Sequence, residues 1–177
     1  MGSYGSILWD VHIVNENDIW VVGNIEIPDS SHLPSYGHCN AAHWDGSNWE
    51  FIRINNSSVD LHQIQYFSEE DIWVTSHCFP YHWDGIEWTL YHLENMGMDT
   101  ICVGSAIWGT SSSNMYFVGL NGGIVHYNGV EFVEMDGMTE INLTSISGYP
   151  NSLWLSGETH AGEIDHGSVL LFYDGFQ

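Results

Sequence analysis

The chain of 177 residues has almost no basic side chains. Arg53 is the only lysine or arginine, against 23 Asp and Glu residues, and the formal net charge is −22 at pH 7. Without a basic patch the chain cannot displace the counterions of nucleic-acid phosphates, so nucleic-acid binding is excluded. Anionic membrane surfaces should repel it for the same reason.

Long apolar runs are also missing. No stretch approaches the 18 apolar residues that a transmembrane helix needs. The first six residues have neither the basic nor the apolar region of a secretory signal peptide. We therefore expect no transmembrane segment, and no signal or lipid anchor within these residues.

Catalytic motifs are absent as well. The sequence has no Gly-x-Ser-x-Gly, no His-Glu-x-x-His and no glycine loop that could cradle a phosphate. A single arginine cannot form the arginine triad that binds sialic acid. The sequence therefore predicts a protein that is not an enzyme. A carbohydrate-active enzyme domain stays open as an alternative, because the spacing of paired carboxylates is three-dimensional.

The dominant feature that is present is a fourfold repeat. A segment like Asp-Ile-Trp-Val is followed by a turn like His-Trp-Asp-Gly-x-x-Trp, and the turn glycines lie 39, 44 and 46 residues apart. Self-similarity at this period indicates radially repeated sheets or a solenoid. The first segments begin at Asp18, Asp71, Asn114 and Ser152, and the turns begin at His43, His82, His126 and Phe172.

Each repeat breaks into short runs rich in Val, Ile, Trp, Tyr and Phe, which are typical of half-buried strands. The Asp-Gly or Asn-Gly step in each turn predicts a tight hairpin in which the Asp or Asn is structural. The predicted strands are 8–14, 19–23, 40–44, 48–54, 61–67, 72–76, 79–83, 87–92, 103–109, 115–119, 123–127, 131–135, 143–148, 153–157 and 169–173.

The recurring aromatic positions indicate how these strands would assemble. Four-stranded antiparallel sheets packed face to face around an axis would bury them between blades. We therefore predict an all-β protein, a single β-propeller segment with about four blades, the last one incomplete. A β-sandwich is the alternative, but it does not explain why the same aromatic positions recur. The blades would span about residues 6–56, 57–98, 99–138 and 139–177.

An incomplete ring leaves three possibilities open. The chain could be part of a longer propeller, two or more copies could complete a ring, or each chain could cover the edge of the next in an extracellular filament. An exposed flat edge promotes aggregation, and strand donation between subunits would satisfy its backbone groups. We therefore expect self-association.

The residues 68–74, 82–88, 107–118 and 124–132 carry a resemblance to a known repeat. It resembles the β-propeller repeat of secreted proteins and lipoproteins of Bacteroidetes-like bacteria, which are described as WD40-like, kelch-like or BNR-like. The resemblance implies a non-catalytic bacterial module, extracellular or on the cell surface, that binds a protein or a glycan or serves structural assembly. This chain departs from the pattern at Phe172, which replaces the His, and in its insertion at 25–38.

Two doubled pairs are candidate metal ligands: Cys39 with His43, and Cys78 with His82. Imidazole and thiolate suit Zn²⁺ or Cu. The alternative is that the histidines are framework residues of the repeat, since His126 recurs without a cysteine. Three cysteines fit no disulfide framework, so we expect them to be small buried residues.

A second candidate cation site follows the strand predicted at 153–157. Glu158, His160, Glu163, Asp165 and His166 combine oxygen ligands that suit Ca²⁺ with two imidazoles. The alternative is a solvated hairpin tip.

The long insertion in the first repeat supplies the remaining candidates. Its segment 29–37 contains His32 and Tyr36 as candidate ligand-binding or partner-binding residues.

Overall fold

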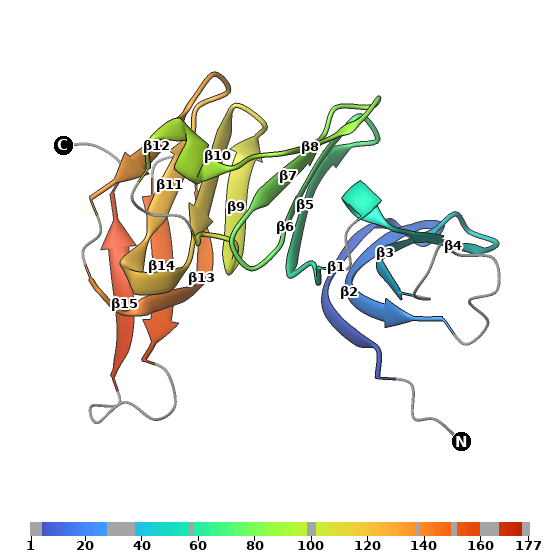
Figure 1. Cartoon of the computed structure of the whole chain (residues 1–177), viewed down its shortest axis with the longest axis horizontal. Coiled ribbons are helices and arrows are strands. Elements are labelled where there is room, and N and C mark those ends of the chain that lie inside the picture. The colour runs from blue at the N-terminus through green and yellow to red at the C-terminus, as the bar shows by residue number, and fades with distance from the viewer. Residues whose placement is uncertain are drawn as a thin grey trace.

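The computed structural model describes residues 5–27, 38–56, 59–98, 102–136, 139–149, 152–159 and 167–174. Within these residues the chain forms fifteen strands, grouped into four antiparallel sheets, and three short 3₁₀ helices (Figure 1). The all-β prediction is therefore confirmed.

The sheets follow one another along the chain, and in each sheet the strands pair in sequence order. The first sheet contains β1 (Ile7–Asn15), β2 (Asp18–Glu26), β3 (His38–Trp44) and β4 (Trp49–Ile52). The second contains β5 (Gln63–Ser68), β6 (Asp71–Thr75), β7 (Pro80–Trp83) and β8 (Trp88–Leu90). The third contains β9 (Ala106–Ser111), β10 (Asn114–Val118), β11 (Ile124–Tyr127) and β12 (Phe132–Met135). The fourth contains β13 (Asn142–Tyr149), β14 (Ser152–Glu158) and β15 (Ser168–Tyr173). The 3₁₀ helices are η2 (Ile54–Asn56), η3 (Leu93–Met96) and η4 (Leu120–Gly122).

Each of the fifteen predicted runs overlaps one strand, and the ends differ by three residues or fewer. The hairpin turns explain this agreement. In the first three sheets the turn glycines Gly46, Gly85 and Gly129 have φ of 88°, 88° and 89°, a region that only glycine adopts without cost.

The Asp or Asn before each of these glycines caps the turn. The Oδ1 atom of Asp84 accepts hydrogen bonds from the backbone N–H groups of Ile86 and Glu87, both at 2.9 Å. Asp45 and Asn128 do the same in the first and third sheets. These bonds lower the pKa values of the Asp45 and Asp84 carboxyls. The turn residues therefore have the structural role that the sequence predicted.

The four sheets are arranged side by side along an arc (Figure 1). The first strands of successive sheets are neighbours: β1 contacts β5, β5 contacts β9, and β9 contacts β13. The first and fourth sheets lie at opposite ends of the arc (Figure 1). The second and third sheets therefore each turn one face toward the preceding sheet and the other toward the following sheet.

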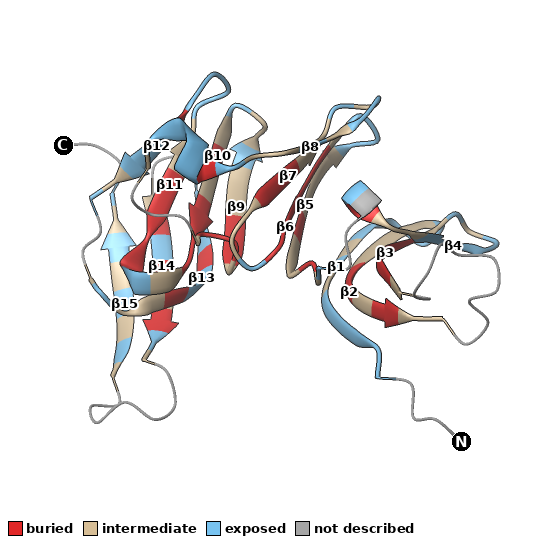
Figure 2. Ribbon diagram, in the orientation of Figure 1, coloured by how far each residue is buried: buried red, intermediate tan, exposed pale blue. Residues whose placement is uncertain are grey.

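The core is divided into layers between consecutive sheets (Figure 2). Val22 and Ala41 of the first sheet meet Ile64 and Ile72 of the second. Trp73 of the second sheet meets Phe117 of the third. Between the third and fourth sheets the layer contains Ala106, Val118, Ile124, Leu143, Ile146, Leu153 and Leu155.

The two outward faces of the arc keep exposed apolar side chains. On the first sheet Ile13 is 64% exposed and Phe51 is 46% exposed. On the fourth sheet Leu170 is 68% exposed and Trp154 is 47% exposed. Figure 2 shows exposed residues along β1 of the first sheet and along β15 of the fourth sheet, the two sheets at the ends of the arc.

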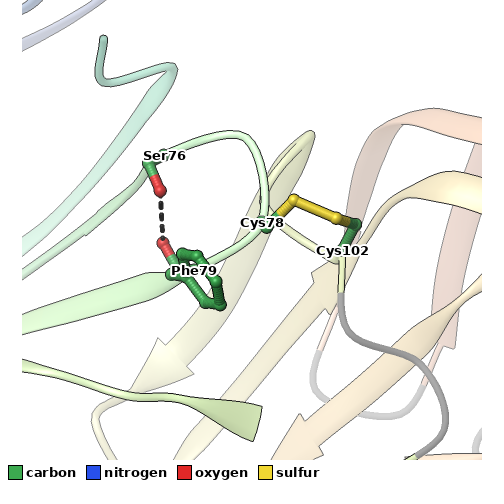
Figure 3. The surroundings of a disulfide bond; sticks show 4 residues. All are labelled: Ser76, Cys78, Phe79 and Cys102. Carbon is green, nitrogen blue, oxygen red and sulfur yellow. Dashed lines mark hydrogen bonds between the residues drawn. A yellow bond between two sulfur atoms is a disulfide. The ribbon is translucent and has the colours of Figure 1, made fainter. Parts of the chain in front are cut away.

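A disulfide bond joins Cys78 to Cys102, which are 24 residues apart (Figure 3). Cys78 lies between β6 and β7, where the Ser76 hydroxyl donates a hydrogen bond to the carbonyl oxygen of Phe79. Cys102 lies ahead of β9, and a Cβ on the nearby Gly104 would fall 1.6 Å from the Ser76 carbonyl oxygen. The bond therefore ties the second sheet to the third where their backbones nearly touch.

This bond corrects the expectation that the three cysteines are separate buried residues. Only Cys39 is a free, buried cysteine. None of the helices in the described residues has the length and apolar character to span a membrane.

Candidate functional site

The first two sheets contain the same internal contact. In the first, Nε2 of His43 lies 2.8 Å from Oδ1 of Asp18, and the His43 ring stacks on Trp20 with centroids 4.3 Å apart. In the second, His82 lies 2.9 Å from Asp71 and stacks on Trp73 at 4.3 Å.

The other two sheets vary this contact. In the third sheet, Nε2 of His126 lies 2.8 Å from the Asn114 amide oxygen, and the ring stacks on Tyr116 at 4.3 Å. In the fourth sheet, Phe172 packs on Trp154 with ring centroids 4.6 Å apart. The histidines are therefore framework residues of the repeat.

The junction between the second and third sheets is filled. Trp73 is fully buried, and its ring contacts Tyr91, Tyr127 and Phe132. Its Nε1–H donates a hydrogen bond to the Ser112 hydroxyl at 2.7 Å, and that hydroxyl donates to Asp71. A side chain from the third sheet therefore completes the contact made inside the second.

The junction between the first and second sheets contains a pocket of about 420 Å³. Trp20, the counterpart of the buried Trp73, is part of its wall and is only partly buried. The lining residues from the first sheet are Asp18, Trp20, His43, Glu50 and Ile52, and those from the second are Tyr66, Glu69, Trp83 and Trp88.

Alignment of the repeats identifies the substitutions that open this junction. Glu69 lies two residues before Asp71, as Ser112 lies two residues before Asn114, so a long carboxylate replaces the bridging hydroxyl. Ile52 lies three residues after Trp49, as Tyr91 lies three residues after Trp88, so a smaller side chain replaces a ring. By the same register Glu50 stands at the position of Thr89.

The walls of the pocket are held by neighbouring side chains. The Trp83 Nε1–H donates a hydrogen bond to the backbone oxygen of Glu69 at 3.0 Å. The rings of Trp83 and Trp88 lie 5.7 Å apart, and His12 stacks on Tyr66 at 5.3 Å. The aromatic walls are therefore fixed by contacts within and between the two sheets.

The pocket is strongly negative. It contains the carboxylates of Asp18, Glu50 and Glu69 and no lysine or arginine. Arg53, the only such residue in the chain, donates from Nε to the His38 carbonyl oxygen at 2.9 Å. Burial, and after it the negative charges of Asp18 and Glu69, raises the pKa of the Tyr66 phenol.

The structure separates the residues of the first candidate metal site. Cys39 packs with Ile25 and Ala42, and burial raises the pKa of its thiol. His43 pairs with Asp18, and Cys78 is in the disulfide bond, so it is not a thiolate ligand here. In the ranges that the structure describes, no group of three or more His, Cys, Asp and Glu side chains could hold a metal ion.

The remaining candidates fall mostly outside the described residues. Glu158 is exposed at the end of β14. The hypotheses of a Ca²⁺ site and of a ligand-binding insertion stay predictions. The undescribed candidates are His160, Glu163, Asp165 and His166 of the cation site, and His32 and Tyr36 of the insertion.

Sequence reasoning did not single out Glu50, Ile52, Tyr66 or Glu69. The available signal was a departure from the repeat. Where one repeat has Glu in place of Ser and another has Ile in place of Tyr, the packing between sheets must change. Such departures become visible only when the repeats are compared position by position.

Comparison with known proteins adds little to this picture. No family model matches the chain, and no curated protein matches it. One solved structure with some similarity is described as "YCF48 bound to D1 peptide", with 13% sequence identity and a TM-score of 0.38. The match covers 97% of this chain and 79% of that chain. Similarity at this level supports no inference, and the all-β architecture rests on the strand pairing itself.

Proposed function

We propose that the chain is a β-propeller segment that acts as a non-enzymatic binding module for a protein partner outside the cell. The pocket between the first and second sheets carries this proposal, because it opens where the next junction is filled. Its volume of about 420 Å³ lies in the range of about 300–1,000 Å³ that is typical of ligand sites. A side chain of a partner protein is a guest of suitable size.

The propeller proposal is supported by the order of the sheets. Their first strands lie next to one another in the series β1, β5, β9 and β13, as the innermost strands of propeller blades do. One face of each sheet packs on the opposite face of the next. Further blades would continue the arc at either end.

The extracellular location is supported by the Cys78–Cys102 disulfide bond. Disulfide bonds persist in oxidising compartments and are rare where glutathione keeps thiols reduced. A strongly acidic chain with one arginine is also suited to remain soluble without adhering to anionic surfaces.

Selection from a library of displayed peptides tests the binding proposal. The matched variant carries Ile52→Tyr and Glu69→Ser, which place the side-chain types of Tyr91 and Ser112 in the first junction. We expect selected peptides to bind the wild-type chain and to lose at least tenfold in affinity for this double variant. Ile86→Ser, at a turn residue that is 84% exposed and outside the pocket, should bind normally.

Several outcomes would contradict the proposal. Equal binding by the wild-type chain and the double variant would place the partner elsewhere on the surface. Binding on a glycan array in place of peptides would favour a glycan module, since the rings of Trp20, Trp83 and Trp88 could stack on sugars. Turnover of a glycan that is lost on Glu50→Gln or Glu69→Gln would favour a carbohydrate-active enzyme.

Assembly is a second candidate function, carried by the two outward faces. Trp154 and Phe172 of the fourth sheet, both about half exposed, occupy the positions that Trp73 and His82 hold in the second. There the third sheet covers Trp73 with Tyr127 and Phe132. Trp44 and Trp49 of the first sheet are the counterparts of Tyr127 and Phe132, and their rings lie 5.7 Å apart. The two ends of the arc therefore carry aromatic residues at the repeat positions that meet in the second junction.

Light scattering and electron microscopy of the intact chain test this second candidate. A mass that is a multiple of 20.0 kDa, reduced to that of a monomer by Trp154→Ser, would support assembly through the outward faces. A monomer at every concentration would exclude self-assembly.

A further inference from the structure

The side chains at the first junction differ from those at the same repeat positions in the second junction, and the differences share one chemical character. At two of the three substituted positions, Glu50 and Glu69 replace neutral side chains, and at the third Ile52 makes room. A random loss of packing would not be expected to add carboxylates on both walls. The substitutions both open the space and make it negative.

Very little positive charge lies near the carboxylates of this pocket. Asp18 pairs with His43, whose ring lies against Trp20. Arg53 is engaged with the His38 carbonyl oxygen, outside the pocket lining. In the second junction the equivalent Asp71 accepts hydrogen bonds from both His82 and Ser112. Glu69 stands at the position of Ser112, and an ionised Glu69 cannot donate a hydrogen bond to Asp18. A cationic ligand would supply the positive charge that the chain itself does not place beside these carboxylates.

Aromatic rings form the rest of the lining. Trp20, Tyr66, Trp83 and Trp88 contribute to the pocket, and all four are partly buried. A cation over the face of a Trp or Tyr ring is attracted by the ring quadrupole. A sugar could also stack on these rings, but it would leave the carboxylates of Glu50 and Glu69 without a positive partner. The charge therefore favours a cation over a neutral guest.

The shape of the cation follows from the same lining. A guanidinium group is planar, stacks on aromatic faces and presents five N–H donors in a fork that matches carboxylates. An ammonium group is compact, strongly hydrated and has three donors. A pocket that combines flat rings with carboxylates on opposite walls suits the guanidinium better.

We propose that the pocket between the first and second sheets binds an arginine side chain of a partner protein. The guanidinium would lie against the tryptophan rings and donate hydrogen bonds to Asp18, Glu50 and Glu69. This inference rests on the proposed binding function and specifies the chemistry of the partner. The net charge of −22 would also speed association with a basic segment.

Isothermal titration with matched pentapeptides tests this assignment. The four peptides have glycine at the flanking positions and arginine, citrulline, lysine or trimethyllysine at the centre. Citrulline has nearly the shape of arginine but no charge. We expect the arginine peptide to bind at least tenfold more tightly than each of the other three, and its affinity to fall as salt is raised from 50 to 500 mM.

Isosteric variants provide the matched controls. Glu69→Gln and Glu50→Gln remove charge with little change of shape, and each should weaken binding of the arginine peptide by roughly tenfold. Glu131→Gln removes an exposed carboxylate from the third sheet, outside the pocket lining, and should bind like the wild type. Thermal unfolding of each variant verifies that the fold is intact.

The outcomes separate this inference from the function on which it rests. If citrulline binds as well as arginine, the charge argument is wrong. If lysine or trimethyllysine binds as tightly, the assignment to arginine is wrong, and the pocket takes cations in general. Selected peptides that bind in the pocket without any arginine would overturn this inference and leave the binding function standing. A chain that binds no peptide at all would overturn both.

Discussion

The first and second junctions of the arc are built on the same repeat but have opposite characters. In the second, Trp73 is fully buried, Ser112 bridges Trp73 to Asp71, and the Cys78–Cys102 bond links the sheets. In the first, the equivalent Trp20 lines a pocket of about 420 Å³. One junction is filled by packed side chains, and the other leaves a pocket on the same framework.

The contrast shows how a repeat protein can gain a site without a new loop. The backbone frame, the His-on-Trp stack and the capped turn are common to both sheets. Only the side chains that cross the junction differ, chiefly Glu69 for Ser112 and Ile52 for Tyr91. The departures from the repeat therefore form the pocket, while the shared residues form the common framework.

The largest expected effect follows from the two tryptophans. Trp73→Ala should cost about 3–5 kcal/mol of the free energy of unfolding, because it empties a buried aromatic cluster. Trp20→Ala should cost less than half of that, since the Trp20 ring already borders open space. Urea unfolding of both variants measures the difference. Equal losses would mean that the first junction is as tightly packed as the second.

The next largest effect on the free energy of unfolding is expected from removing the Cys78–Cys102 disulfide bond. Replacing both Cys78 and Cys102 with serine should lower the free energy of unfolding by about 3 kcal/mol, because the unfolded chain regains the freedom of a closed loop. Dithiothreitol should lower the stability of the wild-type chain by a similar amount and leave the double variant unchanged. Affinity at the first junction should hardly change, and a large loss there would show that the two junctions are coupled.

The bridging position gives a smaller and more selective effect. Ser112→Ala leaves the buried Trp73 Nε1–H without its acceptor, which should cost roughly 1–3 kcal/mol. Glu69→Ala at the equivalent place should change stability by no more than about 0.5 kcal/mol. The same urea assay applies, and a destabilised Glu69→Ala variant would contradict the view that Glu69 serves binding and not packing.

The smallest expected effect is on the pH dependence of stability, and it comes from a histidine of the third sheet. His126 faces the neutral amide of Asn114, and burial lowers its pKa. The unfolded chain takes up this proton near pH 6.5, so the stability from neutral His126 is present above about pH 6.5. It is lost as the pH falls from there toward the lowered pKa of the folded state. His126→Gln should flatten this decline in urea midpoints between pH 8 and 5, and an unchanged slope would exclude His126 as its source.

The strands could be predicted from sequence because their signals are local. Alternation of Val, Ile and aromatic residues, with Asp-Gly or Asn-Gly turns, defines each hairpin without knowledge of its neighbours. The framework role of His43 and His82 was also accessible, since His126 recurs without a cysteine. These features depend on periodicity, which a single chain with four repeats displays.

The disulfide and the pocket could not be predicted, because both arise between sheets. Comparison by repeat position pairs Cys78 with Cys39, whereas its partner Cys102 lies in a connecting segment. That segment reaches Cys78 only because Gly104 allows close backbone approach. The pocket likewise needs the spatial alignment of Glu69 on one sheet with Asp18 and Ile52 on another. Neither relation is visible in the spacing of residues along the chain.

The position of the Cys78–Cys102 bond has a consequence for local opening of the fold. The bond is a covalent link across the second junction, whereas the first sheet meets the second through non-covalent contacts. Examples are the hydrogen bond that the Ile64 backbone N–H donates to Asp10 at 3.0 Å and the stacking of His12 on Tyr66. Contiguous units of a protein open with separate free energies. In hydrogen exchange, the amides of β2 and β3 should therefore lose protection together and before those of β6 and β10. The second and third sheets would then open as one covalently linked unit, and the first sheet would open separately from them.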